Sequence, residues 1–590
     1  MSEDRMLYDV LMVGGSPSSL ALAHHLVDLC IESGQPLNAA ILEKGPEFGR
    51  HVMSGAVSKP HVLNRLFPNH QQDGFPIEAV CTDSHFTVLG TEKTWNVPNA
   101  LLPDGLKKHG YYVLTLSEVV AWMAEQLEAK VNAHEHINLD MLTGFAAHKV
   151  VIEDEKVVGV QVVAESMGCP DEENLYAHLV CFGDKGFVSR DVIEQFGWRK
   201  NPQCWSVGVK EVWEVPESIG QQVKGKVWHT MGYPVLDGSF GGGFVYGMDK
   251  NRLTVGLVMS LDSPNPNINP QQTLQAYKKH PWLQDMIKEG KLLKYGAATL
   301  PEGGYYSLPD TFAGKGALLL GDALGVLNIA SLAGVDKALE CGIQAAEVIH
   351  DSLKEAGSNW LEGVDPSFSD DQLAVYKEKL MATHVGQELY EGRYFRHAWN
   401  ENPRLLKSYL PCVVDGVDKG NPWMGMVSVG LKNNPFQALG DALRLKGLIE
   451  GTTDIGPLTL KKDYEHIVPD FKAEPLNQPQ PKNPETIYSR VDAVYYAGPV
   501  YHEENKHIDE FNADTCVTCI EKYTALNKET PCVNDCTAEV HRVDVIEDIQ
   551  KHGMSLENCI QCRTCEIVCP EENLRVNAAE QGSGPDFMGL

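Results

Sequence analysis

The chain has 590 residues, of which 43% are hydrophobic and 22% charged, as is usual for folded globular proteins; a disordered or fibrous protein is excluded. Its length suggests about three to four domains. Asp and Glu number 80 and Lys and Arg 50, so the formal net charge of −30 argues against nucleic-acid binding. No apolar run of about 18 residues occurs, and we expect no transmembrane helix.

The N-terminus predicts a chain without a targeting segment. Its first residues, Met1 to Arg5, are acidic, and a strand pattern begins by Tyr8. This leaves no room for a signal peptide or an Arg-rich transit peptide.

A β-α-β unit is predicted at the start of the chain. Tyr8 to Val13 form a buried strand, Gly14 to Ser19 a turn, Leu20 to Cys30 a helix and Asn38 to Leu42 a second strand ending at Glu43. Such a turn can hold a pyrophosphate at the helix N-terminus, and the acidic residue can bind ribose hydroxyls. Ser replaces the second and third glycines of the G-x-G-x-x-G pattern, so a turn without a ligand is the alternative. The predicted contacts are Gly14, Gly15, Ser16, Pro17, Ser18, Ser19 and Glu43.

A second signal lies about 300 residues later. The apolar strand Gly316 to Leu320 runs into Gly321 and Asp322, and a helical pattern follows from Asp336 to His350. In flavoproteins of the glutathione-reductase type such an Asp binds a ribityl hydroxyl, whereas a capping Asp without a ligand is the alternative. Together the two signals favour FAD. No further glycine-rich turn suits a nicotinamide nucleotide, so the reductant is a small substrate or, as the cysteines favour, a redox protein.

The fold class expected is α/β: a Rossmann-like FAD-binding domain of the glutathione-reductase type, an inserted antiparallel sheet and a C-terminal ferredoxin-like α+β domain. Within the inserted domain, Gly-rich segments with alternating apolar and polar residues predict the antiparallel sheet. A segment rich in Pro and Lys without periodicity predicts the linker. The predicted parts are the FAD-binding domain (1–205 and 300–355), the inserted domain (206–299), a helical region (356–456), a linker (457–500) and the iron–sulfur domain (501–590).

Eight of the 15 cysteines are clustered near the C-terminus. Cys559, Cys562, Cys565 and Cys569, followed by Pro570, have the spacing of bacterial ferredoxins, in which the fourth cysteine binds the other cluster. The upstream half is Cys516, Cys519, Cys532 and Cys536. By this crossover rule, one [4Fe–4S] cluster takes Cys536, Cys559, Cys562 and Cys565, and another takes Cys516, Cys519, Cys532 and Cys569. A structural zinc at Cys516, Cys519 and Cys532 plus a fourth ligand is the alternative.

With these motifs, the chain resembles the electron transfer flavoprotein–ubiquinone oxidoreductase family nearly from end to end. Similar segments include Arg50 to Ala56, His109 to Val113, Gly208 to Trp213, His229 to Pro234, Phe240 to Phe244, Tyr295 to Ala297 and Gly582 to Pro585. The resemblance implies an FAD enzyme that takes single electrons from reduced electron transfer flavoprotein and passes them in pairs to a membrane quinone.

The resemblance also implies positions for the cofactors. The family's single cluster falls on Cys536, Cys559, Cys562 and Cys565, and its quinone contact on Phe240, Gly241 and Gly242. Lys44, Ser54, Gly55, Leu327 and Asn328 join Gly321 and Asp322 as predicted flavin contacts.

The sequence departs from the family's pattern at three places, which limits how far the family's properties can be carried over. These are Ser16 and Ser19 in the turn, the segment from Asn328 to Asp336, which lacks the usual Lys and His, and Cys569. Cys569 completes the ligands for an additional cluster, so we expect a two-cluster variant. We therefore expect electron transfer flavoprotein or a similar redox protein as the electron donor, and a donor and a quinone that can differ from those usual in the family.

A quinone reaches the enzyme from lipid, so we expect a membrane-facing apolar surface. Candidates are 96–112, with Lys107 and Lys108 beside leucines, and 422–448, with Trp423 and Phe436; a core-facing helix is the alternative for each. We expect peripheral attachment at the cytoplasmic face of a bacterial inner membrane, through a local basic rim.

No catalytic acid or base is assigned. His229, Tyr233 and Tyr246 are candidate proton relays, and packing within the sheet is the alternative. The choice between ubiquinone and menaquinone stays open.

Two other functions compete with a quinone oxidoreductase. One is an FAD-dependent reductase or hydroxylase of a small or isoprenoid substrate, fed by its own clusters. The other is a flavin-free two-cluster electron relay. Reaction with a lipid-like substrate would identify the first, and absence of flavin the second.

Overall fold

The computed structural model describes residues 7–166, 169–402, 404–501, 506–580 and 582–590. The acidic start from Met1 to Arg5, on which the targeting prediction rests, lies outside these ranges.

The flavin domain is built on a sheet in the order β17-β18-β11-β1-β2-β8, with β10 and β9 added beside β11. β1 runs parallel to β2 and β11, and β18 parallel to β11, so the chain returns to this sheet after the inserted domain, as predicted. Val10 to Val13 are all buried, as expected for a strand of a parallel sheet that is covered on both faces. Its strands are β1 (Leu7–Val13), β2 (Leu37–Glu43), β8 (Ile137–Thr143), β9 (Ala146–Glu153), β10 (Lys156–Ser166), β11 (Cys169–Phe182), β17 (Ala313–Gly314) and β18 (Ala317–Leu319).

Helices cover this sheet, and α1 packs along α9. Gly342 of α9 makes this contact close, since a Cβ there would lie 2.4 Å from the carbonyl oxygen of Ser18. α1 begins three residues before the predicted start, because Pro17 can occupy the first turn. The helices are α1 (Pro17–Ser33), α2 (His61–Leu66), α3 (Leu116–Val131), α4 (Ser189–Gln195), α8 (Gly321–Leu324), α9 (Val335–Ala356), α10 (Asp370–Ala382) and α11 (His384–Glu391).

The inserted domain holds a second sheet in the order β16-β12-β15-β14-β13-β5-β6. It is antiparallel except between β13 and β5, and β5 and β6 come from residues that the sequence assigns to the flavin domain. The strands are β5 (Asp83–Leu89), β6 (Thr94–Asn96), β12 (Trp205–Glu214), β13 (Lys226–Gly232), β14 (Gly241–Gly247), β15 (Arg252–Ser260) and β16 (Lys291–Pro301). Helices α5 (Glu217–Val223), α6 (Pro270–Lys278) and α7 (Pro281–Ile287) adjoin it, and β3 (Val57–Ser58), β4 (Ile77–Val80) and β7 (Tyr112–Leu114) form a small separate sheet.

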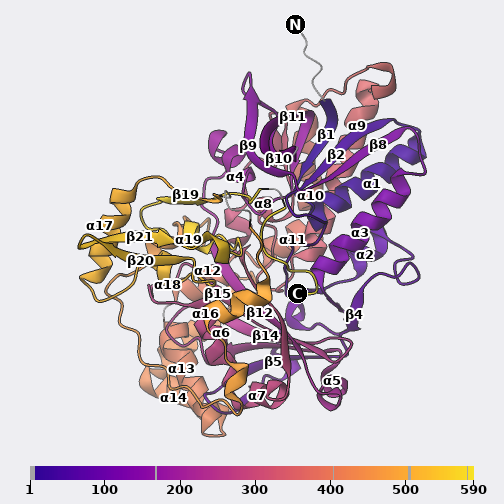
Figure 1. Cartoon of the computed structure of the whole chain (residues 1–590). Coiled ribbons are helices and arrows are strands. Elements are labelled where there is room, and N and C mark those ends of the chain that lie inside the picture. The colour runs from indigo at the N-terminus through magenta and orange to yellow at the C-terminus, as the bar shows by residue number, and fades with distance from the viewer. Residues whose placement is uncertain (1–6, 167–168, 403, 502–505, 581) are drawn as a thin grey trace.

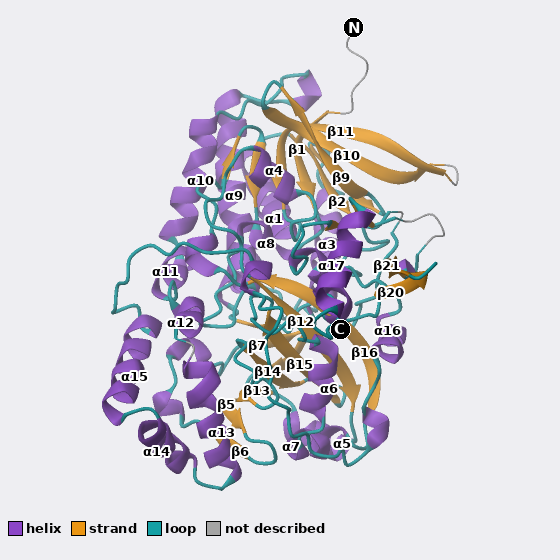
Figure 2. Ribbon diagram, turned by 90° about the vertical axis from the view of Figure 1, so that its left-hand side faces the viewer, coloured by secondary structure: helices purple, strands orange, loops and turns teal. Residues whose placement is uncertain are grey.

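A helical region follows, made of α12 (Phe395–Glu401), α13 (Leu410–Asp418), α14 (Pro422–Lys432) and α15 (Pro435–Ile449). In both views α13 and α14 lie at the end of the molecule opposite β1 and β11 (Figures 1 and 2). None of the described helices is both long and apolar enough to cross a membrane.

The C-terminal domain pairs β19 with β22 and β20 with β21 in antiparallel fashion, in agreement with the ferredoxin-like α+β prediction. Its elements are β19 (Ile508–Glu510), α17 (Ala513–Thr524), α18 (Pro531–Asn534), β20 (His541–Ile546), β21 (Ile549–Met554), α19 (Thr564–Ile567) and β22 (Leu574–Val576), preceded by α16 (Arg490–Ala497). The domain lies to one side, between the levels of the two large sheets (Figure 1).

Candidate flavin, quinone and iron–sulfur sites

A cavity of about 500 Å³ extends from the glycine turn after β1 to the start of β14. Most predicted flavin and quinone contacts line it, namely Gly14, Gly15, Ser16, Pro17, Ser18, Glu43, Lys44, Ser54, Gly55, Asp322, Leu327, Phe240, Gly241 and Gly242. Ser19, Gly321 and Asn328 are buried outside this lining. The amide of Asn328 instead donates to the carbonyl of Glu388 (3.1 Å) and accepts from the nitrogen of Ala330 (2.9 Å).

The glycine turn keeps its shape although two glycines are absent. Gly14 has a φ of +93°, and its nitrogen donates to the carbonyl of Leu42 at 2.8 Å. Ser16 caps α1, since its Oγ accepts from the nitrogen of Ser19 at 3.3 Å. Space for the serine side chains comes from Gly183 at the end of β11, where a Cβ would lie 2.2 Å from Ser19 Oγ. A glycine that directly follows the neighbouring strand therefore compensates for those missing from the turn.

The acidic groups of the cavity are placed as an FAD site requires. Glu43 Oε2 accepts from the nitrogen of Gly15 (3.0 Å), and Oε1 from that of Gly45 (2.7 Å). These bonds hold the carboxylate at the end of β2, where it can also accept from ribose hydroxyls. Burial raises the pKa of Glu43 and of Asp322. The first turn of α1 offers its N–H groups to a pyrophosphate, so the donor set fits FAD.

One part of the cavity wall was not predicted from the sequence. Gly183, Asp184 and Lys185 follow β11, and all three line it. Asp184 Oδ2 accepts from the nitrogen of Val188 at 2.9 Å and so fixes this loop. The signal was available: an apolar strand followed by Gly-Asp is the pattern that picked out Gly321 and Asp322.

The predicted quinone contacts lie where β14 begins. A Cβ at Gly241 would lie 2.6 Å from the carbonyl oxygen of Val258, and one at Gly242 would lie 2.3 Å from that of Thr230. These glycines let β14 pack between β13 and β15, while the Phe240 ring contacts Phe395 and Trp399.

Two of the three candidate proton relays line the cavity. His229 Nε2 and Tyr246 Oη are 3.0 Å apart, and both side chains belong to its wall. Tyr233 is buried elsewhere and donates to the carbonyl of Ala276 at 2.9 Å, as sheet packing would explain.

The cysteines gather into the two predicted quartets. The charge of Cys562 raises the pKa of Cys536, Cys559 and Cys565, after the larger effect of burial, so these four lie together. A second, surface-proximal hollow is lined by Cys516, Cys519, Cys532 and Cys569. Burial, then neighbours that include Cys569, raise the pKa of Cys516 to about 12 and of Cys519 to about 11.

The two crossing cysteines occupy equivalent settings. The nitrogen of Val540 donates to Cys536 Sγ and that of Asn573 to Cys569 Sγ, each at 3.2 Å and each four residues further along. Four cysteine thiols with N–H donors aimed at sulfur are typical of the ligands of an iron–sulfur cluster. His552 also lies beside Cys516 and Cys532, which gives a zinc ion an alternative fourth ligand.

The first cysteine quartet adjoins the cavity directly. Ile560 and Gln561, between Cys559 and Cys562, are part of its wall. Lys44, at the end of β2, donates to Gln561 Oε1, and burial lowers the pKa of Lys44 to about 8.

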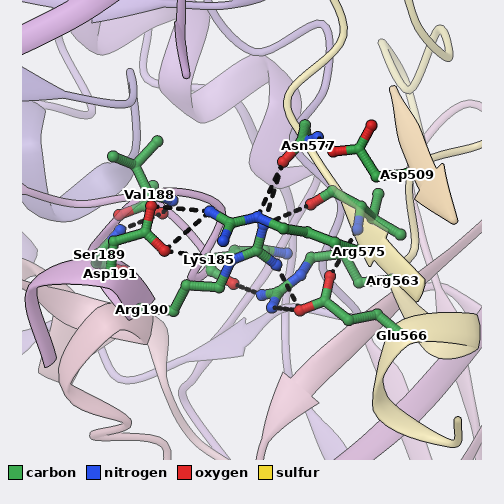
Figure 3. A network of polar contacts seen from close by, with 12 residues as sticks. Lys185, Val188, Ser189, Arg190, Asp191, Asp509, Arg563, Glu566, Arg575 and Asn577 are labelled. Atoms are coloured by element: carbon green, nitrogen blue, oxygen red, sulfur yellow. Dashed lines mark hydrogen bonds and ion pairs between the residues drawn. The ribbon is translucent and has the colours of Figure 1, made fainter. Parts of the chain in front are cut away.

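An ion-pair network joins the cysteine loop to the flavin domain (Figure 3). Arg190 of α4 and Arg563 both point at the Glu566 carboxylate, and Arg563 also donates to the carbonyl of Lys185. Arg575 binds both carboxylate oxygens of Asp191 at 2.8 Å. The iron–sulfur domain is thereby fixed against the wall of the cavity.

The fold and these sites define a FAD-binding flavoprotein with a C-terminal iron–sulfur domain. The fold is similar to that of a geranylgeranyl bacteriochlorophyll reductase-like protein from Thermoplasma acidophilum (TM-score 0.53, 16% identity, covering 75% of this chain and 100% of that one). The family described as "ETF-QO, ubiquinone-binding" matches residues 205–300, and "Electron transfer flavoprotein-ubiquinone oxidoreductase, 4Fe-4S" matches residues 485–588.

Relatives match over nearly the whole chain. The probable mitochondrial electron transfer flavoprotein–ubiquinone oxidoreductase of Schizosaccharomyces pombe is 30% identical over 98% of this chain and 85% of its own. The corresponding protein of Pseudomonas aeruginosa is 29% identical over 100% of both, and the human mitochondrial one 28% identical over 99% of this chain and 89% of its own. The chain belongs to the electron transfer flavoprotein–ubiquinone oxidoreductase family, and it is an oxidoreductase.

Proposed function

We propose that this enzyme oxidises reduced electron transfer flavoprotein, or a similar redox protein, and reduces a membrane quinone. One observation carries the proposal: a single cavity is lined by the flavin turn, by Gly241 and Gly242, and by Ile560 and Gln561 of the cysteine loop. An iron–sulfur donor, a flavin and a quinone can therefore lie in sequence. Family membership disfavours both competing functions.

Each part of the cavity has a role in this reaction. The α1 N-terminus and Glu43 would hold the pyrophosphate and the ribose, and Asp322 the ribityl chain. FAD supplies the exchange between single electrons and the pair that a quinone accepts. Phe240, Phe395 and Trp399 form an apolar wall that excludes water from the quinone end.

We also propose that the chain holds two [4Fe–4S] clusters. Cys536 lies with Cys562, and Cys569 lines the hollow of Cys516, Cys519 and Cys532, which supports this proposal because the same crossing occurs in two-cluster ferredoxins. The second quartet lines a separate hollow in which Cys516 and Cys532 are half-buried, and this partial exposure supports a role in accepting electrons from a redox partner.

Membrane attachment through α14 and α15 is the third part of the proposal. Phe436 is 85% exposed and Leu431 78%, and other large apolar side chains on these helices are also exposed: Trp423, Met424, Met426, Val427, Leu439 and Leu443. Lys432, Arg444 and Lys446 are exposed among them and can contact an anionic leaflet. Ile449, at the end of α15, lines the cavity, so a quinone tail could pass from lipid to the flavin.

The first test is cofactor content in protein purified without oxygen. We expect one FAD with about eight iron and eight sulfide per chain. The protein should then pass electrons from reduced electron transfer flavoprotein to a short-chain ubiquinone. Absence of flavin, or turnover of an isoprenoid substrate in place of quinone, would overturn the proposal.

Cys569→Ser tests the cluster assignment. We expect about half the iron to be lost and the flavin-proximal cluster to keep its electron paramagnetic resonance signal. Cys536→Ser is the matched variant and should spare the other cluster. Zinc with about four iron in the wild type would instead assign Cys516, Cys519 and Cys532 a structural role.

A further inference from the structure

A buried carboxyl group of the cavity wall is left unused by the flavin and iron–sulfur sites. It belongs to Glu302, which directly follows β16, is 2% exposed and lines the cavity. Quinone reduction consumes protons as well as electrons, and a carboxyl group in the wall of the site can supply one. We propose that Glu302 gives a proton to the bound quinone as the general acid of its reduction; the inference rests on the proposed function.

Hydrogen bonds through the inserted sheet place Glu302 near the predicted quinone contacts. Ser206 Oγ on β12 donates to Glu302 Oε2. Ser206 is opposite Ser260 of β15, and the nitrogen of Ser260 donates to the carbonyl of Phe240 at 2.9 Å. Phe240 is the first of the predicted quinone contacts, so a short series of bonded neighbours connects it with the carboxyl group.

Helix α12 connects the same two places independently. His397 Nε2 lies 3.3 Å from the carbonyl oxygen of Gly303, the residue after Glu302. Phe395 and Trp399 of this helix contact the Phe240 ring and line the cavity. Glu302 therefore lies close to the apolar wall that would enclose the quinone.

Gln203 connects Glu302 with the flavin end of the cavity. Gln203 Oε1 accepts from the nitrogen of Gly303 at 2.9 Å. A Cβ at Gly325 would lie 2.1 Å from Gln203 Nε2, and Gly325 directly follows α8, the helix of Asp322. The carboxyl group thus lies between the residues that would hold the flavin and those that would hold the quinone, where electrons and protons have to meet.

The titratable groups around Glu302 come from three segments. Arg396 of α12 forms a buried ion pair with Asp262, which follows β15. Asp463 accepts from the first nitrogen of β12 at 3.1 Å. Burial raises the pKa of Asp463 and lowers that of His397 to about 4, so the Arg396–Asp262 pair provides the charges.

These surroundings let Glu302 exchange a proton near neutral pH. Burial, the largest effect, raises its pKa to about 7. The hydrogen bond from Ser206 and the charge of Arg396 act in the opposite direction, and the charge of Asp262 raises the pKa further. The carboxyl group is protonated below about pH 7, and the Ser206 hydroxyl and Arg396 stabilise the carboxylate that remains after the proton has left.

The protonation of His229 and Tyr246, which also line the cavity, suits a different task. Burial lowers the pKa of His229 to about 3 and raises that of Tyr246. At neutral pH the imidazole is uncharged and the phenol keeps its proton. These two side chains can orient a quinone oxygen by hydrogen bonding, while Glu302 supplies the proton.

The reaction balances with protons that come from solvent. The quinone takes two electrons through the cofactors and two protons, one on each oxygen, to give the quinol. The O–H bond of Glu302 breaks as an O–H bond forms on one quinone oxygen, and solvent supplies the proton for the other. Solvent reprotonates the Glu302 carboxylate after the quinol has left.

Glu302→Gln tests this role, with Glu289→Gln as the control, because Glu289 is an exposed glutamate just before β16. Pre-reduced holoenzyme is mixed with a short-chain ubiquinone between pH 5.5 and 9, and flavin reoxidation is recorded. We expect Glu302→Gln to be at least tenfold slower at pH 6, with normal FAD and iron contents. The rates of the wild type and of Glu289→Gln should fall as pH rises through about 7, since the acid form of Glu302 is lost there.

Ser206→Ala provides a second test that keeps the carboxyl group. Loss of the hydrogen bond to the carboxylate should raise the pKa of Glu302, so the rate should fall at a higher pH than in the wild type. Infrared difference spectra of the oxidised protein, recorded without quinone, measure the titration directly. The C=O stretch of a protonated carboxyl group should disappear near pH 7 in the wild type and should be missing from Glu302→Gln.

The outcomes separate this inference from the proposed function. No quinone reduction by the wild type would contradict the proposed function itself. A wild-type rate and pH profile in Glu302→Gln, or a carboxyl band that persists in this variant, would contradict only the role of Glu302. If Glu302→Gln does not fold, Ser206→Ala decides: a shifted pH profile supports the role, and an unchanged one overturns it.

Discussion

At the scale of single residues, the flavin turn shows that a site can keep its geometry while its motif is degraded. Ser16 and Ser19 take the places of two glycines, and Gly183, directly after the adjacent strand β11, makes room for their hydroxyls. Gly15 has no such compensation. A Cβ there would lie 2.6 Å from the Phe48 ring and 2.8 Å from Glu43 Oε2.

Gly15→Ala should therefore displace the Glu43 carboxylate and weaken FAD binding at least tenfold. FAD retained per chain after gel filtration, and its titration into apoprotein, measure this. Gly440→Ala is the control, because a Cβ at Gly440 meets nothing within 4 Å. Equal FAD retention by the two variants would show that the turn tolerates a side chain.

Burial of Glu302 in the cavity wall should make the stability of the folded protein depend on pH. Burial raises its pKa from 4.5 to about 7. The folded state thus binds more protons than the unfolded state between these pH values, so the free energy of unfolding falls as pH rises through that window. Glu302→Gln should match the wild type below about pH 4.5 and gain up to about 3 kcal/mol by pH 8.

Calorimetric melting at pH 4.5, 6 and 8 checks this prediction. The Tm difference between Glu302→Gln and wild type should grow with pH. A difference that stays constant over this range would mean that Glu302 titrates normally in the folded protein.

At the scale of elements, short sequence patterns predicted only the structure that is formed by residues near one another in the chain. The Cys559 to Cys569 spacing and the first β-α-β unit fix ligands and strands within a few residues of one another. The addition of β5 to β13 joins segments about 140 residues apart, and no local pattern carries that pairing. Lys108 was grouped with Lys107 in a basic rim, but the structure buries Lys108 completely, which contradicts that part of the prediction.

The exposed apolar face of α14 and α15 predicts where lipid is bound. Leu431→Glu with Phe436→Glu should lower sedimentation with anionic vesicles at least tenfold, because it places charges in the apolar layer. Reduction of a water-soluble quinone should persist. Tyr495→Glu is the control, since Tyr495 is 81% exposed on α16, away from these helices. Similar vesicle binding by all the variants would place the membrane contact elsewhere.

At the scale of the whole molecule, electron transfer depends on how the iron–sulfur domain is held against the flavin domain. One guanidinium nitrogen of Arg575 donates to both carboxylate oxygens of Asp191, and this pair lies in the network that also fixes the loop of Cys562 and Cys565 (Figure 3). A shift of this domain would lengthen the path from the first cysteine quartet to the cavity. The Arg575–Asp191 pair should therefore affect the rate of electron transfer to the flavin, although neither residue is a ligand of a cofactor.

Asp191→Arg should slow flavin reduction by reduced electron transfer flavoprotein several-fold, because it sets two guanidinium groups against each other. Stopped-flow absorbance follows this step, and iron and FAD contents should stay at wild-type values. Asp191→Arg with Arg575→Asp restores opposite charges and should recover most of the rate. A double variant as slow as the single one would mean that Asp191 acts through some other contact, and a single variant of normal rate would mean that the remaining pairs of Arg190, Arg563 and Glu566 suffice to hold the domain.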